Sequence, residues 1–352
     1  MDRKLRILVD IGHPAHVHFF KNFIWEMEKR GHKIFVTGYD KDNSEALLKL
    51  YNIPFTRTVK YGKNMASKMY QNTKLALIFK RFISKNKIDY AIGIGSYHLA
   101  WASLGTKCTC FVFSDTEHAR VINWLSKIAC SKLVTPSCYL IDEGKKQIRY
   151  KGYHELAYLH PKRFTPDPSI LKELGVGKDE KYVIVRFVSW TASHDIGQRG
   201  FSIEDKIALV KEIEKYARPF ITSEGEIPKE LLKYKIQIPF HRIHDVLYHA
   251  ALYVGEGATM ASESAMLGTP NIFVHEMAGI LGTTIEQEKY GLMINQRYHN
   301  LKEIIPLINK CLNEKKKWED NRDKMLKQKI DVTKYMISMV ENYPDNQEVG
   351  HN

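Results

Sequence analysis

The sequence predicts an α/β protein with two open parallel sheets, on three observations. In the first half, strand-like apolar runs alternate regularly with segments whose apolar residues recur at helical spacing. Such alternation is typical of right-handed βαβ units. A second set of the same kind follows a proline-bearing segment at 158–168. The chain, at 352 residues, is also long for one hydrophobic core.

In the first half, the apolar run 6–10 predicts a strand, and phenylalanines at helical spacing predict a helix over 17–30 that Gly31 stops. A strand at 33–37 and a helix at 44–51 follow, and the helix ends before Pro54. The later elements are strands at 91–95, 110–113 and 132–135 and helices at 99–104 and 120–130.

In the second half we expect strands at 182–187, 219–222, 251–254 and 271–274 and helices at 203–216 and 243–249. A helix also follows the glycine turn at 255–257 and is closed by Gly268 and Pro270. From Lys302 onward the chain reads as helical, and such a C-terminal helix can cross back onto the first domain. We place the domains at 1–165 and 166–335, with a tail at 336–352.

The net charge is +13, and its distribution is uneven. Nine Lys or Arg residues and no Asp or Glu lie between Arg57 and Ile88, interleaved with large apolar side chains. This pattern fits either an anionic membrane surface or a solvated basic face over an ordinary core stripe. No nucleic-acid motif accompanies the charge, so a nucleic-acid partner is not expected.

No apolar stretch has the length of a membrane span or of a secretory signal, so we expect a cytoplasmic protein. The five cysteines form no C-x-x-C pair and are odd in number. This composition predicts reduced structural thiols rather than a zinc site or a disulfide framework.

The most informative segment is the glycine turn that follows the apolar run 251–254. A strand, a tight turn and a helix N-terminus make an anion site, since the first N–H groups of a helix have no partner within it. Glu263 lies within the first two turns and is placed to accept from a hydroxyl. An ordinary β–turn–α unit is the alternative. If the turn binds a nucleotide diphosphate with a free ribose, the expected contacts are Gly257, Ala258, Thr259, Met260 and Glu263.

Two other segments of the second half suit the same ligand. Arg186 ends a strand and leads into a long loop that begins with Ser189, and the charge and hydroxyls there suit a diphosphate. His241 and Arg242 precede the helix before the glycine turn and are placed to contact a base or phosphate. An exposed helix start explains His241 and Arg242 equally well.

The first strand ends in a turn that carries Gly12, His13 and His16. A neutral imidazole is the usual general base near physiological pH, and a helix N-terminus disfavours the imidazolium. A base or a hydrogen-bonding partner of the substrate is one interpretation, helix capping is a second, and metal binding is a third. The spacing of the histidines does not match a zinc pattern, and no metal is expected.

Two further strand ends carry polar residues. At Gly95, Ser96 and Tyr97, small residues let a ligand approach the backbone, and we expect these three residues on the acceptor side together with Gly12 and His118. The segment 114–118 contains Asp115, Glu117 and His118. Either carboxylate is placed to orient a hydroxyl or accept its proton, while one residue of the segment caps the next helix.

These motifs resemble the GT-B superfamily, which comprises nucleotide-sugar glycosyltransferases and the non-hydrolysing UDP-N-acetylglucosamine 2-epimerases. The most similar pattern is that of the N-acetylglucosaminyltransferase that makes lipid II. Ala15-His16-Val17 is similar to the start of its first helix, and the resemblance implies His16 as catalytic base. Its donor motif is similar to 257–263, which implies that Glu263 holds the ribose hydroxyls. Gly95-Ser96-Tyr97 and Asp115-Thr116-Glu117 are similar to its second glycine loop and its acceptor-side loop.

The resemblance implies a GT-B fold, with two Rossmann-like domains whose parallel sheets face each other across a cleft. It also implies a metal-independent, cofactor-free glycosyltransferase that uses a nucleotide-sugar donor, expected to be UDP-linked. The acceptor would be a saccharide or a lipid-linked sugar of the cell envelope, reached from the inner face of the membrane. The Gly-His-Pro-Ala-His-Val opening at 12–17 is similar to an uncharacterised archaeal and bacterial branch.

Two alternative functions stay open at this point. A nucleotide-sugar 2-epimerase would use carboxylates such as Asp115, Glu117 or Asp195, although its usual Arg-Pro-Glu first loop is absent here. A nucleotide-sugar-binding protein without turnover is the other. The sugar, the acceptor, the stereochemical outcome and the oligomeric state are not predicted.

Overall fold

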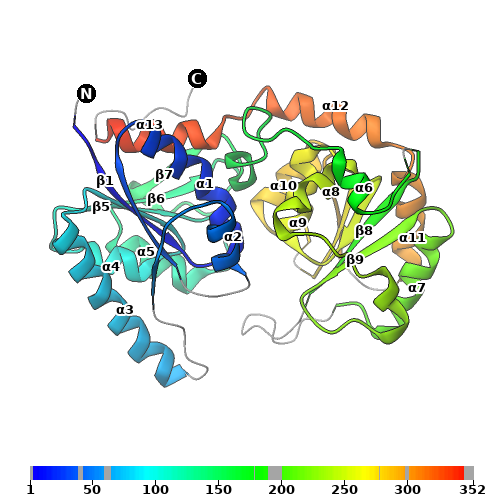
Figure 1. Cartoon of the computed structure of the whole chain (residues 1–352), viewed down its shortest axis with the longest axis horizontal. Coiled ribbons are helices and arrows are strands. Elements are labelled where there is room, and N and C mark those ends of the chain that lie inside the picture. The colour runs from blue at the N-terminus through cyan, green and yellow to red at the C-terminus, as the bar shows by residue number, and fades with distance from the viewer. Residues whose placement is uncertain are drawn as a thin grey trace. The chain divides into compact units, whose positions relative to one another are not determined.

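The computed structural model describes residues 3–38, 43–58, 65–177, 179–188, 200–276, 278–297 and 301–344, with backbone alone over 65–73. The chain forms two compact units, each an α/β body (Figure 1). The first unit joins the chain up to Tyr158 to the segment from Ile330 onward. The second unit is the continuous stretch Leu159–Lys329.

In the described part of the chain, the first unit contains a seven-stranded sheet of order β3-β2-β1-β4-β5-β6-β7. Every neighbouring pair is parallel, and Asp10 at the end of β1 stands level with Thr37 of β2 and Gly93 of β4. The polar ends of these strands therefore meet at one edge of the sheet. The strands are β1 (Arg6–Ile11), β2 (Lys33–Gly38), β3 (Thr56–Arg57), β4 (Tyr90–Ile94), β5 (Thr109–Phe113), β6 (Lys132–Pro136) and β7 (Gln147–Tyr150).

The helices of the first unit cover its sheet. Helix α1 begins where His13 caps it and Pro14 stands in its first turn, and Gly31, at a φ of 84°, follows its end. Its inner face is apolar and fully buried. The helices are α1 (Pro14–Lys29), α2 (Ser44–Leu50), α3 (Met65–Asn86), α4 (Tyr97–Ser103), α5 (Arg120–Ala129) and α13 (Val332–Asn342), with 3₁₀ turns η1 (Gly144–Lys146) and η2 (His154–Ala157).

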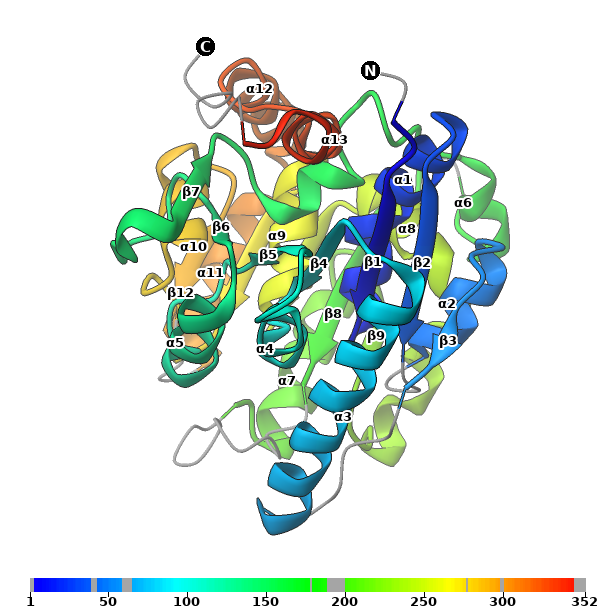
Figure 2. The same ribbon diagram turned by 90° about the vertical axis from the view of Figure 1, so that its left-hand side faces the viewer.

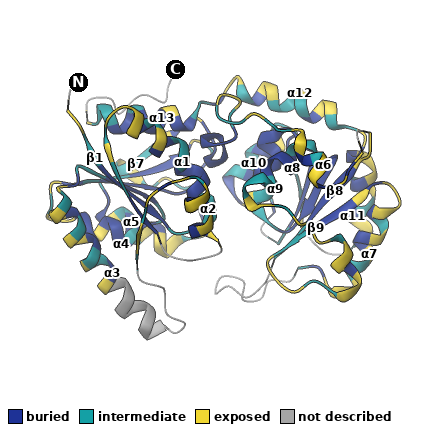
Figure 3. Cartoon of the chain, in the orientation of Figure 1, coloured by how far each residue is buried: buried dark blue, intermediate teal, exposed yellow. Residues whose placement is uncertain are grey.

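The second unit contains, over its described residues, a five-stranded parallel sheet of order β12-β11-β10-β8-β9. Its strands are β8 (Tyr182–Phe187), β9 (Arg218–Ser223), β10 (Leu252–Gly255), β11 (Asn271–Val274) and β12 (Ile294–Gln296). The central strands of both sheets are buried (Figure 3). The helices are α6 (Ser169–Glu173), α7 (Ile203–Glu214), α8 (Ile243–His249), α9 (Ala258–Leu267), α10 (Gly282–Lys289), α11 (Leu301–Cys311) and α12 (Lys315–Leu326), with η3 (Lys229–Tyr234) and η4 (Phe240–Arg242).

The predicted α/β class with two parallel sheets is confirmed, and the structure divides the chain differently from the predicted boundaries. The units separate after Tyr158 rather than after residue 165, and the second one ends at Lys329 rather than at residue 335. Residues 336–342, assigned above to a tail, form most of α13, because its apolar side chains are buried against the first unit. A C-terminal helix that returns to the first domain is thus confirmed.

Strands β3, β7 and β12 were not predicted. They are short and partly exposed, so they lack the buried apolar run that marks a central strand. No helix in the described ranges is long and apolar enough to span a bilayer.

Candidate functional site

The turn between β10 and α9 is built as the sequence predicts. Gly255 pairs in register with Arg186 of β8, and a Cβ at Gly255 would lie 2.6 Å from the backbone oxygen of Arg186. A larger residue is therefore excluded there. Gly257 is the N-cap residue of α9, and the N–H groups of Ala258, Thr259 and Met260 lie in the first turn, where a helix leaves its donors without intrahelical acceptors. This end of α9 suits an anion.

Arg186 lies over this turn. A Cβ built on Gly257 would stand 3.2 Å from its Cγ and 3.6 Å from its Nε. The guanidinium Nη2 lies 2.5 Å from Oε1 of Glu224, a half-exposed residue just after β9. A cationic side chain thus stands beside the α9 N-terminus, and a solvent-facing carboxylate pairs with it.

Glu256, inside the turn, was not predicted to have a role. Its side chain is buried, and its two oxygens accept the N–H groups of Val188, at 3.0 Å, and Phe201, at 2.8 Å. These residues flank the long loop that begins at Ser189. Glu256 therefore holds both ends of that loop against the turn, while Ser189 itself lies outside the described residues.

Glu263 lies in the second turn of α9 and is buried. Nε2 of His244, in the first turn of α8, lies 3.0 Å from its Oε1. The ring of Phe164 packs edge-on against His244, with the ring centroids 6.2 Å apart. The predicted ribose-binding carboxylate is therefore held by a histidine to which sequence reasoning assigned no role.

The two residues predicted to contact the donor just before α8, His241 and Arg242, differ in their surroundings. The Arg242 guanidinium bonds to Asp167 at 2.7 Å and also pairs with Asp245 and Glu173, so it is a structural cross-link. His241 lies in η4, with its Nδ1 buried and, among the described residues, without a hydrogen-bond partner. Both residues are partly buried, so the exposed helix start predicted as the alternative does not describe them, and a donor contact at His241 stays a prediction.

In the first unit, both histidines of the β1–α1 turn use Nδ1 as an acceptor. The Ala15 N–H donates to His13, and the Gly12 N–H donates to His16, each over 3.2 Å. Burial, helped by the neighbouring His13, lowers the pKa of His16 to about 3. His16 is therefore neutral, and its proton resides on Nε2. In this arrangement His16 presents an N–H donor, whereas the base role implied by the resemblance requires an available lone pair.

Asp10, at the end of β1, was also missed. It is buried and accepts from Ser96 at 2.6 Å and from Thr37 at 3.1 Å, while Nε2 of His98 lies 3.3 Å away. Its pKa is lowered, because the bonds to His98 and the two hydroxyls outweigh burial, the largest single influence, which raises it. Ser96, predicted on the acceptor side, is committed to this carboxylate.

The neighbouring glycine and tyrosine lie where the prediction placed them. Gly95 adopts a left-handed φ of 59° after β4, and Tyr97 begins α4. The small turn thus lies at the same sheet edge as the β1–α1 turn, because β1 and β4 are neighbours. The structure leaves a substrate contact at Gly95 and Tyr97 as a prediction.

Asp115 follows β5 and is paired with His154, whose Nδ1 lies 2.9 Å from Oδ2 of Asp115. The pKa of Asp115 falls to about 2, since His154 and a bond from Thr116 outweigh the raising effect of burial. Burial acts to lower the pKa of His154, but the Asp115 carboxylate outweighs burial, so the pKa of His154 is raised. Asp10 and Asp115 act to raise the pKa of His16 and His154 acts to lower it, so these groups influence one another electrostatically.

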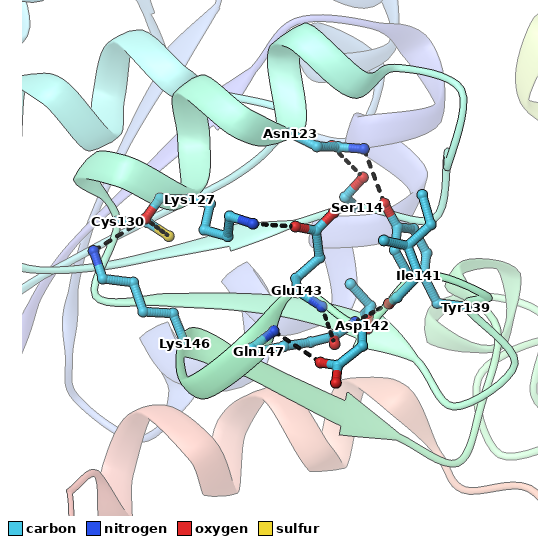
Figure 4. A network of polar contacts seen from close by, with 12 residues as sticks. Ser114, Asn123, Lys127, Cys130, Tyr139, Ile141, Asp142, Glu143, Lys146 and Gln147 are labelled. Carbon is cyan, nitrogen blue, oxygen red and sulfur yellow. Dashed lines mark hydrogen bonds and ion pairs between the residues drawn. The ribbon is translucent and has the colours of Figure 1, made fainter.

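The other residues of the segment 114–118 are either hydrogen-bonded within the fold or exposed on the surface. Ser114 donates to Asn123 of α5, which also donates to Tyr139, so Ser114 belongs to a structural network (Figure 4). Glu117 is buried and accepts the Leu140 N–H at 3.2 Å. His118 is exposed. Of the two carboxylates that the structure describes in this segment, only Asp115 has a partly exposed side chain. Asp115 therefore combines charge with access to solvent.

Within the described residues, no group of three or more His, Cys, Asp or Glu side chains is arranged to hold a metal ion. Three contacts between a carboxylate and a histidine join residues that are distant in the sequence. They pair Asp10 with His98, Asp115 with His154, and Glu263 with His244. His154 follows β7, so recognition of that strand would have placed it at the same sheet edge.

The chain matches a family model over residues 5–345, described as "Protein of unknown function (DUF354)". The chain belongs to the DUF354 family. This DUF354 chain is 25% identical over 331 residues to the uncharacterized protein MJ0665 of Methanocaldococcus jannaschii, covering 88% of this chain and 93% of MJ0665.

Comparison with solved structures shows which fold this DUF354 protein has. It is similar to the UDP-GlcNAc 2-epimerase of M. jannaschii in complex with UDP-GlcNAc and UDP, with a TM-score of 0.68, 13% identity and coverage of 96% of this chain and 100% of that one. It is also similar to MurG of Acinetobacter baumannii, with a TM-score of 0.60, 14% identity and coverage of 96% and 99%. The predicted GT-B fold of two Rossmann-like units is confirmed.

Proposed function

We propose that this DUF354 protein is a glycosyltransferase that moves a sugar from a nucleotide diphosphate sugar, UDP-linked, to a saccharide or lipid-linked acceptor of the cell envelope. The observation that carries the proposal is the β10–α9 turn. It combines a helix N-terminus, the overlying Arg186 and the buried Glu263 in one unit. Donors for a diphosphate beside an acceptor for ribose hydroxyls match the two ends of a nucleoside diphosphate.

In this proposal, the first-turn N–H groups of α9 and Arg186 bind the diphosphate and stabilise its growing charge as it leaves. Backbone donors are already oriented, so they stabilise this charge without reorganising during the reaction. The nucleotide-sugar ligands of the UDP-GlcNAc 2-epimerase structures support this ligand class. The glycosyltransferase branch of the superfamily and the cofactor-free chemistry are parts of the same proposal.

The first unit supplies the acceptor side. Asp115 is ionised and is oriented by His154 and Thr116, so it accepts a hydrogen bond from the acceptor hydroxyl. The bond from that oxygen to the anomeric carbon forms as the bond to the diphosphate breaks. The hydroxyl proton becomes acidic as this happens and passes to Asp115. His13 and His16 contribute N–H donors on the acceptor side.

The electrostatics of three candidate groups of the first unit, Asp10, Asp115 and His16, bear on the alternative of a 2-epimerase. Removal of a carbon-bound proton near neutral pH calls for a base whose pKa lies close to that range. The pKa values of Asp10 and Asp115 are lowered instead, and that of His16 lies at about 3. These groups are better suited to hydrogen bonding and charge stabilisation than to abstraction of a carbon-bound proton.

The proposed function is tested by incubating the full chain with UDP-sugars, with and without saccharide and lipid-linked acceptors. We expect UDP and a glycosylated product to form when an acceptor is present, and no interconversion of the sugar nucleotide without one. Chromatography with mass spectrometry measures both. Interconversion in the absence of an acceptor would identify an epimerase, and tight binding without any turnover would identify a binding protein. The variant E263Q lacks the proposed ribose-binding carboxylate. It is the control that shows whether turnover depends on binding of the donor at this site.

We also propose that the first unit binds an anionic membrane surface, where a lipid-linked acceptor lies. In helix α5 the polar residues Asn123 and Ser126 are buried, whereas several large apolar residues are exposed. The exposed fractions are 70% for Val121, 41% for Ile122 and 57% for Trp124. An amphipathic helix with its apolar face turned to solvent is typical of an interaction surface.

The basic helix α3 lies one helix away from α5. Helix α4 lies between α5 and the basic helix α3 (Figure 2), and it contacts both, through a bond from Trp101 to the Leu125 carbonyl and one from Lys80 to the Leu104 carbonyl. The basic stretch predicted from the sequence extends back to Arg57, but no side chains of 59–73 are described. Positive charge around an apolar patch suits the negative surface of phosphatidylglycerol.

Vesicle flotation tests this surface. We expect the protein to float with phosphatidylglycerol vesicles and not with phosphatidylcholine vesicles, and we expect binding to fall at least about fivefold in the variant V121S/I122S/W124S. The control is W25S, which removes another exposed tryptophan, this one from α1. Equal binding of the triple variant and the W25S protein would show that α5 is not the contact surface.

A further inference from the structure

In the second unit, a contact between His244 of α8 and Glu263 of α9 has no function assigned to it so far. The His244 and Glu263 side chains are both buried, at 3% and 8% exposure, and stand 3.0 Å apart. They come from separate helices and are 19 residues apart in the sequence. We propose that His244 is a positioning residue that fixes the Glu263 carboxylate for ribose recognition, and thereby sets the selectivity of the site for ribonucleotides. The inference rests on the proposed function.

The first step in the argument is the cost of burial. An ionised carboxylate removed from water is stable only when a partner compensates it. The N–H of the imidazole supplies one such bond to Oε1 of Glu263. Without His244, the carboxylate would lose this bond and turn toward water or another donor, so its acceptor geometry would change.

The second step is the rigidity of the pair. His244 lies in the first turn of α8, and the ring of Phe164 packs edge-on against it with an interplanar angle of 81°. Helices α8 and α9 pack directly against each other. The ring of Phe164 and the packing of α8 against α9 both restrain His244. A restrained histidine holds Glu263 in one rotamer, as a site that recognises a hydroxyl requires.

The third step is selectivity. A site built to hydrogen-bond a hydroxyl discriminates strongly against the analogue that lacks it, because a buried polar group is then left without a partner. Such discrimination depends on the acceptor being fixed beforehand. Arg186 and the α9 N–H groups bind phosphate in ribonucleotides and deoxyribonucleotides alike. A change at His244 should therefore alter the response to the 2′-hydroxyl and leave phosphate binding intact.

The test compares a nucleoside diphosphate with its 2′-deoxy form by titration calorimetry on the full chain. UDP, GDP, ADP and CDP are first screened on the wild-type protein, and the tightest is used with its 2′-deoxy counterpart. We expect the wild type to prefer the ribose form at least about tenfold. In H244M the ribose form should weaken by about that factor while the deoxy form keeps its affinity. The preference should therefore fall close to one.

Two further variants separate positioning from general stability. H244Q retains an N–H donor and should recover most of the ribose preference. H249M makes the same replacement on the same helix, at a half-buried histidine for which the structure describes no bond to Glu263, and should leave both affinities unchanged. If H244M folds poorly, the H244Q protein still tests the inference, since its preference should be close to that of the wild type.

The outcomes distinguish the two proposals. A wild-type protein that binds none of the four diphosphates would overturn the proposed function and this inference with it. A wild type that prefers ribose, together with an H244M protein that weakens for both forms equally, would leave the proposed function standing and reject the role of His244. A ribose preference lost in H244M and restored in H244Q supports the inference.

Discussion

Replacement of His16 by glutamine should lower kcat for glycosyl transfer by no more than about tenfold, whereas replacement by alanine should lower it by about 100-fold or more. The expectation follows from the bond between the Gly12 N–H and Nδ1 of His16, which leaves the imidazole proton on Nε2. Glutamine also presents an N–H donor but cannot act as a base. An enzyme that uses His16 as a donor should therefore tolerate it within about tenfold.

The pH dependence gives a second readout on the same residue. With a pKa of about 3, His16 stays neutral throughout the range in which histidines ordinarily titrate, between about pH 5 and 8. The wild-type and H16Q proteins should therefore show parallel profiles of kcat over that range. The exposed His118 provides the matched control variant H118Q, which should behave as wild type. If H16Q is as inactive as H16A and the wild-type profile shows a base of pKa near about 6.5, His16 is the general base after all.

Opposite changes in nucleotide affinity are expected at Arg186 and Glu224. The variant R186M should weaken UDP binding by about 10- to 100-fold, the range expected for loss of one charge-assisted contact to phosphate. The variant E224Q should tighten it by about threefold to tenfold, because the Glu224 carboxylate competes with an incoming diphosphate for the same cation. That carboxylate lies 2.5 Å from the Arg186 guanidinium.

Titration calorimetry with UDP measures both changes. The matched control is E226Q, which removes a carboxylate from the same segment two residues further along. The affinity of E226Q should stay within about twofold of the wild type, since no described bond links Glu226 to Arg186. Weaker binding by E224Q would mean that Glu224 supports Arg186 in the bound state and does not compete with the phosphate.

The sequence predicted those parts of the site that depend on local pattern. An apolar run, two glycines and a helical segment closed by Gly268 specify the β10–α9 turn within a few adjacent residues. The polar segment after β5 and the histidines after β1 were found in the same way. For these elements, backbone geometry and residue type are linked over short distances.

The partners of these groups could not be predicted, because they depend on tertiary contacts. Asp10 contacts His98 from a neighbouring strand end, and Asp115 contacts His154, which follows a strand too short to be recognised. Arg242 looked like a ligand contact from its position at a helix start, and the fold turns it to Asp167 instead. The protonation state of His16 likewise follows from burial and from one backbone bond, neither of which is visible in the sequence.

The return of the last helix to the first unit has a consequence for biosynthesis. Thr333 of α13 bonds to the Ala157 carbonyl, and the Ile330 N–H bonds to the Lys151 carbonyl. The body that is begun first on the ribosome is therefore completed last, after the continuous stretch 159–329 has already been made. During translation, the amino-terminal half lacks the helix that covers α1, and a nascent chain stalled just before residue 330 carries one finished lobe and one unfinished one.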